Sequence, residues 1–139
     1  MTIRQLSVFL ENKSGRLNEV LSVLASANIN IIALTIADTT EYGILRMIVS
    51  DPDKACDILR NSGFSSNVSD VISLELSMSP GSLSGILDCF ASHNISIEYL
   101  YAFSFGSKAV LVMRTDNRPK ALETIKEKQL KLITEEDLK

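Results

Sequence analysis

Polar and apolar residues alternate near the start of the chain, and the same alternation returns 66 residues later. A period of two is typical of a strand with one buried face. The apolar positions of the two copies are Leu6, Val8, Leu10, Ile72, Leu74 and Leu76. The pattern therefore predicts a strand at the same place in two copies of one repeat.

A glycine turn and an amphipathic helix follow each of these strands, in "NKSGRLNEVL" and in "MSPGSLSGIL". Apolar residues at the spacing i, i+3, i+4, i+7 predict one buried stripe on each helix. The two stripes comprise Leu17, Val20, Leu21, Leu24, Leu83, Ile86, Leu87 and Phe90. Ser14 and Ser79 are the expected N-caps, and Pro80 is expected at the first helical position of the second copy.

The remainder of each copy contains two more strand-like runs, a second helix and a short extended end. The strand-like runs are "INIIALTIA" and "GILRMIVS" in the first copy and "ISIEYLYAF" and "KAVLVMRT" in the second. The second helices are expected to begin at Pro52 and Pro119, and the first of them to stop at a left-handed Gly63. Each copy is therefore predicted to be a βαββαβ unit.

This order of elements predicts an α+β fold of two ferredoxin-like units, each an antiparallel sheet with its helices on one face. The expected domains are residues 1–70 and 71–139. A unit of about 65 residues buries only a modest core, so we expect the two sheets to pair side by side.

Composition and charge exclude several classes of function. A net charge of −3 and a pI near 5.1 argue against a surface for nucleic acid or anionic membranes, which requires clustered Lys and Arg. The sequence shows no secretory signal and no run of about 18 apolar residues, so we expect a cytoplasmic location. Cys56 and Cys89 lack a CxxC spacing and are expected to be reduced, buried thiols.

The other functions that this topology supports each need residues that the sequence lacks. A soft-metal carrier needs thiolates in the first turn, where Ser14 and Ser79 stand, so no metal site is expected. An RNA-binding sheet needs aromatic residues in a basic surround, and Tyr99 and Tyr101 of the second copy are more typical of packing. The single histidine, His93, ends a helix without a nucleophile nearby in the pattern, so we expect no catalytic residue and no cofactor.

The duplicated turn is the remaining candidate for a binding site. A small residue and a glycine bring the backbone close to a ligand, and the N–H groups at a helix start favour an anion such as the α-carboxylate of an amino acid. In the first copy, Asn12 and Asn30 carry side-chain carbonyls suited to an α-ammonium group, where the second copy has Met78 and Ser96. The alternative is that both Asn residues serve only the turns.

These motifs resemble an ACT domain, present twice: a strand, the turn Asn-x-(Pro/Ser)-Gly-x-Leu, a helix, and Asn-Ile-Asn-Ile leading into a strand. The resemblance covers essentially the whole chain and is to the free-standing tandem ACT proteins of bacteria. It implies a regulatory module that binds an amino acid or another small ligand where two ACT units pair. The ligand-binding residues that it implies are Asn12, Lys13, Ser14, Gly15, Leu17, Asn30 and Ile31 in the first copy, and Ser79, Pro80, Gly81, Leu83, Ser96 and Ile97 in the second.

Two departures from the family's pattern distinguish the copies. Ser14 replaces the usual proline of the first turn, which changes little because serine caps a helix well. Met78 replaces a polar residue in the second turn, and a thioether is a poor partner for an ammonium group. The first copy is therefore expected to be better equipped to bind a zwitterion.

The leading hypothesis is a non-enzymatic regulatory protein that binds an amino acid and transmits its occupancy to a partner, such as an enzyme of amino-acid metabolism. The rival hypothesis is an interaction subunit that binds no metabolite and stabilises an enzyme through exposed sheet edges. An enzyme of unknown type is the third alternative. ACT units pair within one chain or between two chains, so a homodimer is one possible assembly.

Overall fold

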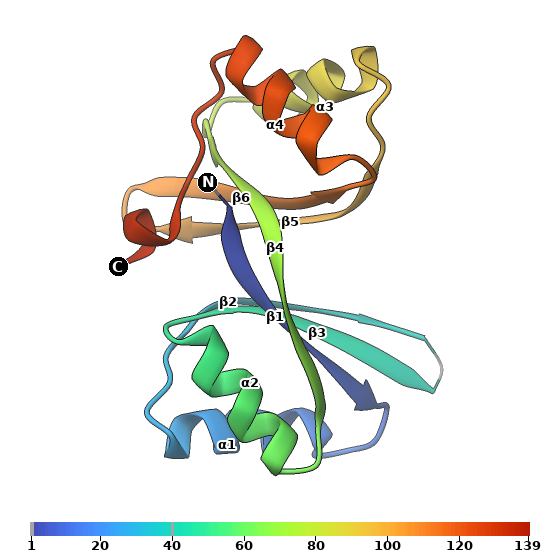
Figure 1. Cartoon of the computed structure of the whole chain (residues 1–139), viewed down its shortest axis with the longest axis vertical. Helices are drawn as coiled ribbons and strands as arrows, with labels where there is room; N and C mark the ends of the chain where they lie inside the picture. Colours follow the sequence, from blue (N-terminus) through green and yellow to red (C-terminus); the bar gives the residue numbers. More distant parts are fainter. Residues whose placement is uncertain (1, 40) are drawn as a thin grey trace. The chain divides into compact units, whose positions relative to one another are not determined.

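A computed structural model describes residues 2–39 and 41–139 of the chain (Figure 1). The chain divides into two compact units. We call Arg4–Asp70 the N-terminal unit, and Val71–Lys139 together with the start of the chain through Ile3 the C-terminal unit. Each unit is described by itself below.

Within its described residues, the N-terminal unit contains four strands and two helices, with strand order β2-β3-β1-β4. Strand β1 pairs with β3, and β3 with β2, in antiparallel ladders. The helices α1 and α2 lie on the same face of the strands (Figure 1). The elements are β1 (Ile3–Glu11), α1 (Arg16–Ser26), β2 (Ile31–Asp38), β3 (Tyr42–Val49), α2 (Pro52–Asn61) and the first half of β4 (Ser65–Leu76).

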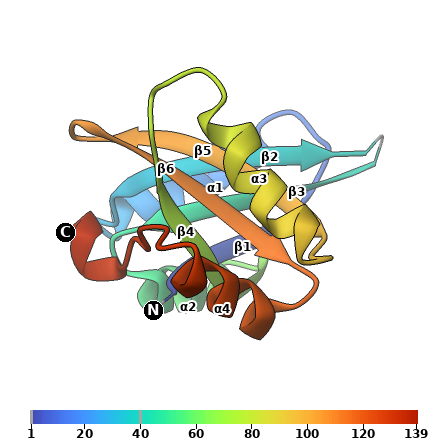
Figure 2. The ribbon, with the colours of Figure 1, turned by 90° about the horizontal axis from the view of Figure 1, so that it is seen from above.

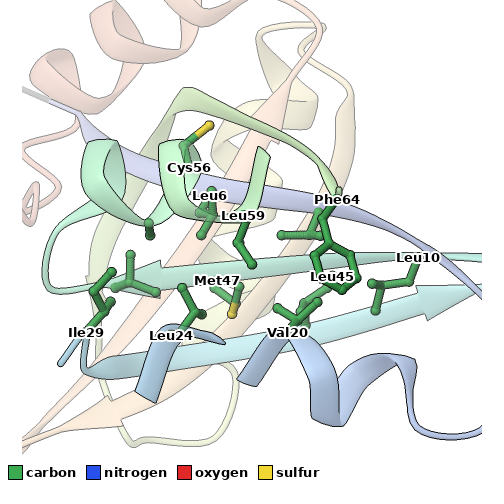
Figure 3. Packing of buried hydrophobic residues seen from close by; sticks show 13 residues of the cluster. Leu6, Leu10, Val20, Leu24, Ile29, Leu45, Met47, Cys56, Leu59 and Phe64 are labelled. Carbon is green, nitrogen blue, oxygen red and sulfur yellow. The ribbon is translucent and has the colours of Figure 1, made fainter. Parts of the chain in front are cut away.

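The core of the N-terminal unit forms where the alternating strands meet the helical stripes. Leu6 pairs with Met47 and Val8 with Leu45 across β1 and β3, so all four side chains point to one face of the sheet. The helices place their own apolar stripes on that face, and Figure 3 shows the side chains interdigitating. The labelled members of this cluster are Leu6, Leu10, Val20, Leu24, Ile29, Leu45, Met47, Cys56, Leu59 and Phe64.

The C-terminal unit repeats this arrangement with β4 as its first strand. Antiparallel ladders join β4 to β6 and β6 to β5, and residue Leu132 bridges to Leu74 on the other side of β4. Figure 2, viewed from above, shows α3 and α4 on the same side of β5 and β6. The elements are α3 (Ser82–Ser92), β5 (Ile97–Phe105), β6 (Lys108–Thr115), α4 (Arg118–Glu127) and the short 3-10 helix η1 (Glu135–Leu138).

The fold class expected from the sequence is therefore confirmed: each unit is a ferredoxin-like α+β unit with antiparallel strands and helices on one face. The side-by-side pairing of the two sheets stays a prediction.

The starts of α1 and α3 differ from the expectation, while α2 begins at Pro52 as expected and α4 begins at Arg118, one residue before Pro119. Helices α1 and α3 begin after Gly15 and Gly81, not after Ser14 and Ser79, and no side chain caps either helix. Pro80 precedes the glycine instead of occupying the first helical position. The reason is that a glycine with positive φ turns the chain into the helix, which leaves the preceding serine too early to serve as a cap.

Candidate functional site

The two strand-to-helix turns have nearly the same backbone conformation. Gly15 has φ 86° and ψ −11°, and Gly81 has φ 84° and ψ −4°. Both values lie in the left-handed region, which glycine enters without steric cost. An ideal Cβ at either position has no heavy atom within 4 Å, so open space lies in front of each turn.

The other two helix starts are closed by side chains. The Lys54 N–H donates to Oδ1 of Asp51 at 3.2 Å at the start of α2, and the Lys120 N–H donates to Oδ1 of Asn117 at 3.1 Å at the start of α4. The first N–H groups of any helix lack intrahelical acceptors. No side chain caps α1 or α3, and the N–H groups of Arg16 and Ser82 at their starts donate to the carbonyls of Lys13 and Ser79 at 3.3 and 3.2 Å.

Charged side chains around the first turn are paired with each other. Lys13 Nζ lies 2.9 Å from Oε2 of Glu11, and Arg16 Nη1 lies 2.7 Å from Oε2 of Glu19. The hydrogen bond from Lys13, followed by the charge of its ammonium group, lowers the pKa of the Glu11 carboxyl. The Arg16 guanidinium also stacks on the Phe64 ring, 4.8 Å from its centroid. Both cationic side chains are therefore already paired with a carboxylate. The main-chain N–H groups remain as the feature of this turn that favours an anion.

Asn12 connects the first turn to the hairpin between β2 and β3. Its N–H donates to the Glu41 carbonyl at 2.8 Å, and its side-chain Nδ2 donates to the Thr39 carbonyl at 3.5 Å. The side chain is exposed beside the turn. Asn12 therefore lies at the start of the first turn, and its role in ligand binding stays a prediction.

Asn30 and Ile31 lie at the opposite end of the N-terminal unit. The Asn30 N–H donates to Ser50 Oγ, and the Ser50 N–H donates to the Asn30 carbonyl, both at 2.9 Å. Glu11 pairs with Tyr42 at one end of β3, whereas Ile31 pairs with Val49 at the other end. Seven residues of extended strand separate these ends by about 24 Å.

One unit by itself therefore does not bring the Asn12 and Asn30 amides to the same ligand. The second copy has the same geometry, because the Ser96 N–H donates to Asp116 Oδ1 at 3.0 Å beside Ile97, far along β6 from the second turn. The spacing of these residues in the sequence did not predict that they lie at opposite ends of a unit. Their positions depend on which end of β3 or β6 each residue lies beside.

A shallow hollow of about 520 Å³ lies at the second turn. None of its lining residues is charged, and Met78 on its rim is 80% exposed. Ser79, Gly81 and Leu83 were expected at this site, whereas Pro80 does not line the hollow. The complete lining is Leu76, Ser77, Met78, Ser79, Gly81, Ser82, Leu83, Ser84 and Leu87.

Three of the serines that line this hollow, Ser77, Ser82 and Ser84, were missed as site residues, whereas Ser79 was expected. The Ser77 hydroxyl donates to Ser79 Oγ at 3.1 Å, and the Ser84 hydroxyl donates to the Gly81 carbonyl at 3.1 Å. The serine run in "LSMSPGSLSG" was the available signal. A neutral lining of leucine, methionine and serine offers apolar contact and hydroxyl groups and no charge for a ligand's ammonium group.

The aromatic residues of β5 point to the sheet face that the helices do not cover. Tyr101 pairs with Val112, while the neighbouring Leu100 and its partner Met113 belong to the core under the helices. His93 Nδ1 lies 2.8 Å from the Cys89 carbonyl at the end of α3. Neither feature adds a catalytic group to the turns.

Comparison with known proteins identifies a family for the entire chain. The family model described as an ACT domain pair matches residues 1–139. No curated protein matches the sequence. Within the described residues, no helix is long and apolar enough to cross a membrane.

Several solved structures resemble the chain. The protein BT0572 from Bacteroides thetaiotaomicron is 46% identical, with a TM-score of 0.92 over 99% of this chain and 96% of that one. The regulatory subunit of aspartate kinase from Thermus thermophilus is 14% identical, with a TM-score of 0.64 over 91% of this chain and 93% of that one. Aspartate kinase from Synechocystis is 19% identical, with a TM-score of 0.59 over 91% of this chain and 25% of that one. The two kinase structures are similar to this chain in fold.

Proposed function

The chain belongs to the family of ACT domain pairs, and from this premise we propose that it is a non-catalytic regulatory protein that binds an amino acid at its strand-to-helix turns. Binding changes the affinity of the protein for a partner, which is the definition of allosteric coupling between two sites. We propose an enzyme of amino-acid metabolism as that partner, because regulatory subunits of aspartate kinase share the fold. The proposal includes a cytoplasmic location.

The observation that carries this proposal is the contrast between capped and uncapped helices. Asp51 and Asn117 cap α2 and α4, whereas α1 and α3 begin at a left-handed glycine without any side-chain cap. An α-carboxylate accepts hydrogen bonds from such N–H groups and is further stabilised by the positive end of the helix dipole. The same arrangement occurs twice, at equivalent positions of the repeat.

The two turns differ in the ligand chemistry that they support. Asn12 places an amide beside the first turn, within reach of a ligand's ammonium group. Met78 takes the corresponding place in the second turn, above a hollow without charged lining residues. We therefore assign the amino-acid site to the first turn, and the second turn contributes a weaker site or none.

A thermal-shift screen of the purified protein against the twenty amino acids at millimolar concentration tests the proposal. A ligand that binds only the folded state raises the melting temperature by mass action. We expect one amino acid, or a few related ones, to raise it by several degrees, with calorimetry confirming a dissociation constant. If no amino acid changes the melting temperature, the interaction subunit that binds no metabolite becomes the better hypothesis.

A negative charge introduced at the first turn tests whether the ligand's carboxylate binds there. Gly15→Asp adds a carboxylate where the ligand's carboxylate is proposed to bind, and we expect at least a tenfold loss of affinity, about 1.4 kcal/mol or more. Gly63→Asp is the control, because Gly63 also has positive φ (90°) and open space around an added Cβ. Both variants should lose similar stability, and only Gly15→Asp should lose the ligand. Equal affinities of the two variants would place the ligand elsewhere.

A further inference from the structure

The hollow at the second strand-to-helix turn has the size and the apolar lining of a small-molecule site. Its volume of about 520 Å³ lies within the range of such sites. Leu76 and Leu83 line it and also pack against the core of the C-terminal unit, and Leu87 adds a third aliphatic side chain. Met78 lies on the rim and is 80% exposed, and a flexible thioether adapts to the shape of an apolar ligand. The hollow therefore suits a ligand with an aliphatic body.

Three hydrogen-bond donors at the start of α3 belong to residues that line this hollow. The N–H groups of Leu83 and Ser84 form no hydrogen bond within the described residues, as is usual for the first turn of a helix. The Ser82 side chain also lines the hollow and forms no hydrogen bond with another described residue. These donors and the positive end of the helix dipole favour an anion such as a carboxylate.

The hollow offers no charged partner to an ammonium group. None of its lining residues is an acid or an amide. Glu75 precedes Leu76 in β4, so its side chain points to the opposite face of the sheet. The Glu75 carboxylate pairs there with Lys108 and Lys131, at 4.0 and 3.6 Å. An ammonium group placed in the hollow would therefore lose hydration without gaining an anionic partner.

The first copy of the repeat provides an internal comparison. Sixty-six residues earlier, the positions of three lining serines hold charged residues, and the position of the rim methionine holds an amide. These residues are Glu11, Lys13, Arg16 and Asn12, in place of Ser77, Ser79, Ser82 and Met78. The neutral lining is thus a property of the second turn and not of the repeat.

We propose that the hollow at the second turn binds a small monocarboxylate with an aliphatic body and no ammonium group, a class that includes the aliphatic α-keto acids. The carboxylate accepts hydrogen bonds from the N–H groups of Leu83 and Ser84, and the aliphatic body lies against Leu76 and Leu87. The inference rests on the part of the proposed function that places a carboxylate at these turns. The ligand class rests on the lining of the hollow, and it differs from the amino acid of the first turn by the ammonium group.

Titration calorimetry with three ligands that share one aliphatic body tests the ligand class. The ligands are α-ketoisocaproate, isocaproate and leucine, of which only leucine carries an ammonium group. We expect α-ketoisocaproate, isocaproate or both to bind the wild-type protein. Lack of binding by both monocarboxylates would overturn the proposal.

A negative charge at the second turn tests the location of the site. Gly81→Asp should weaken the binding of the monocarboxylate at least about tenfold, because it places a carboxylate where the ligand's carboxylate is proposed to bind. Gly63→Asp is the control, since both glycines have positive φ and open space around an added Cβ. Equal affinities of the two variants would overturn the assigned location.

A charge on the rim tests the discrimination without straining the backbone. In Met78→Asp, the new carboxylate repels a monocarboxylate and attracts an ammonium group, and the position is exposed enough to accept it. The dissociation constant of the bound monocarboxylate should rise at least about threefold, whereas that of leucine should not rise. An unchanged constant for the monocarboxylate would contradict its placement in the hollow.

The results distinguish this inference from the proposed function. An amino acid that binds at the first turn, with neither monocarboxylate bound, would overturn the inference and leave the proposed function in place. A monocarboxylate whose binding Gly81→Asp removes, with no amino acid found in the screen, would support the inference and overturn the amino-acid assignment.

Discussion

At the scale of single residues, backbone conformation separates glycines that are required from glycines that are not. Gly81 has φ +84°, in the left-handed region, whereas Gly85 lies inside α3 without a positive φ. Neither position has a heavy atom within 4 Å of an added Cβ, so crowding does not distinguish them. The difference between them is conformational strain alone.

We therefore expect alanine to have opposite effects at these two positions. Gly81→Ala should lower the free energy of unfolding by about 1 to 2 kcal/mol, because an L-residue with a Cβ is strained at that φ. Gly85→Ala should raise it by about 0.5 to 1 kcal/mol, because alanine is the better helix former. Urea denaturation of both variants measures the two changes, and a stabilising Gly81→Ala would contradict the strained turn.

At the scale of elements, the first and second helices of each unit begin in different ways. The Asp51 side chain accepts a hydrogen bond from the N–H of Lys54, and Pro52 starts α2 where its missing N–H has no consequence. The start of α1 has neither device, and Ser14 caps no helix there. A side-chain cap therefore stabilises the second helix of each unit, and the first helix of each unit has none.

Removing a cap should therefore matter at α2 and not at α1. Asp51→Ala should lower the free energy of unfolding by about 0.5 to 2 kcal/mol. Ser14→Ala, at an exposed position that caps nothing, should change it by less than about 0.5 kcal/mol. Thermal or chemical denaturation monitored by circular dichroism compares the two variants, and a larger loss for Ser14→Ala would refute the assignment of the caps.

Strand and helix order could be predicted from the sequence because both depend on short-range periodicity. The stripe that includes Val20 and Leu24 predicted a helix that buries those residues, and both are fully buried. The acidic end of the chain was less predictable: Asp137 accepts a hydrogen bond from the Thr134 N–H, and Leu138 is buried, so the segment forms a 3-10 helix. A four-residue segment with one buried leucine is too short to show a periodic hydrophobic pattern in the sequence.

At the scale of the whole molecule, surface carboxylates give the chain's stability an acid dependence. The hydrogen bond from Arg4 lowers the pKa of Asp53, with Arg4 Nη2 lying 2.6 Å from Oδ1, and joins β1 to α2. The hydrogen bond from the backbone N–H of Thr134 likewise lowers the pKa of the Asp137 carboxyl. A carboxyl with a lowered pKa in the folded state contributes stability above its ordinary pKa and loses it as pH falls through the lowered value.

The melting temperature should accordingly decrease as pH falls from about 6 to about 3. Asp53→Asn should lower the melting temperature at neutral pH and make its decrease in acid smaller, because one of the linked carboxyls is absent. The effect should be small, since the ion pair is solvent-exposed. Calorimetry of both proteins across this range checks the prediction, and an unchanged acid dependence in Asp53→Asn would show that Arg4 does not act through this carboxyl.

The sequence by itself determined the duplication, the order of strands and helices, and the position of the glycine turns, because periodicity and turn chemistry are local properties of the chain. Only the tertiary structure decided that Asn12 and Asn30 lie at opposite ends of one sheet, that Tyr101 faces away from the helices, and that Ile36 lies on an open edge. Each of these depends on which distant residues pair across strands, and strand register is a property of the folded sheet. The position of the glycine turn therefore follows from the local sequence, whereas the separation of Asn12 from Asn30 depends on strand pairing.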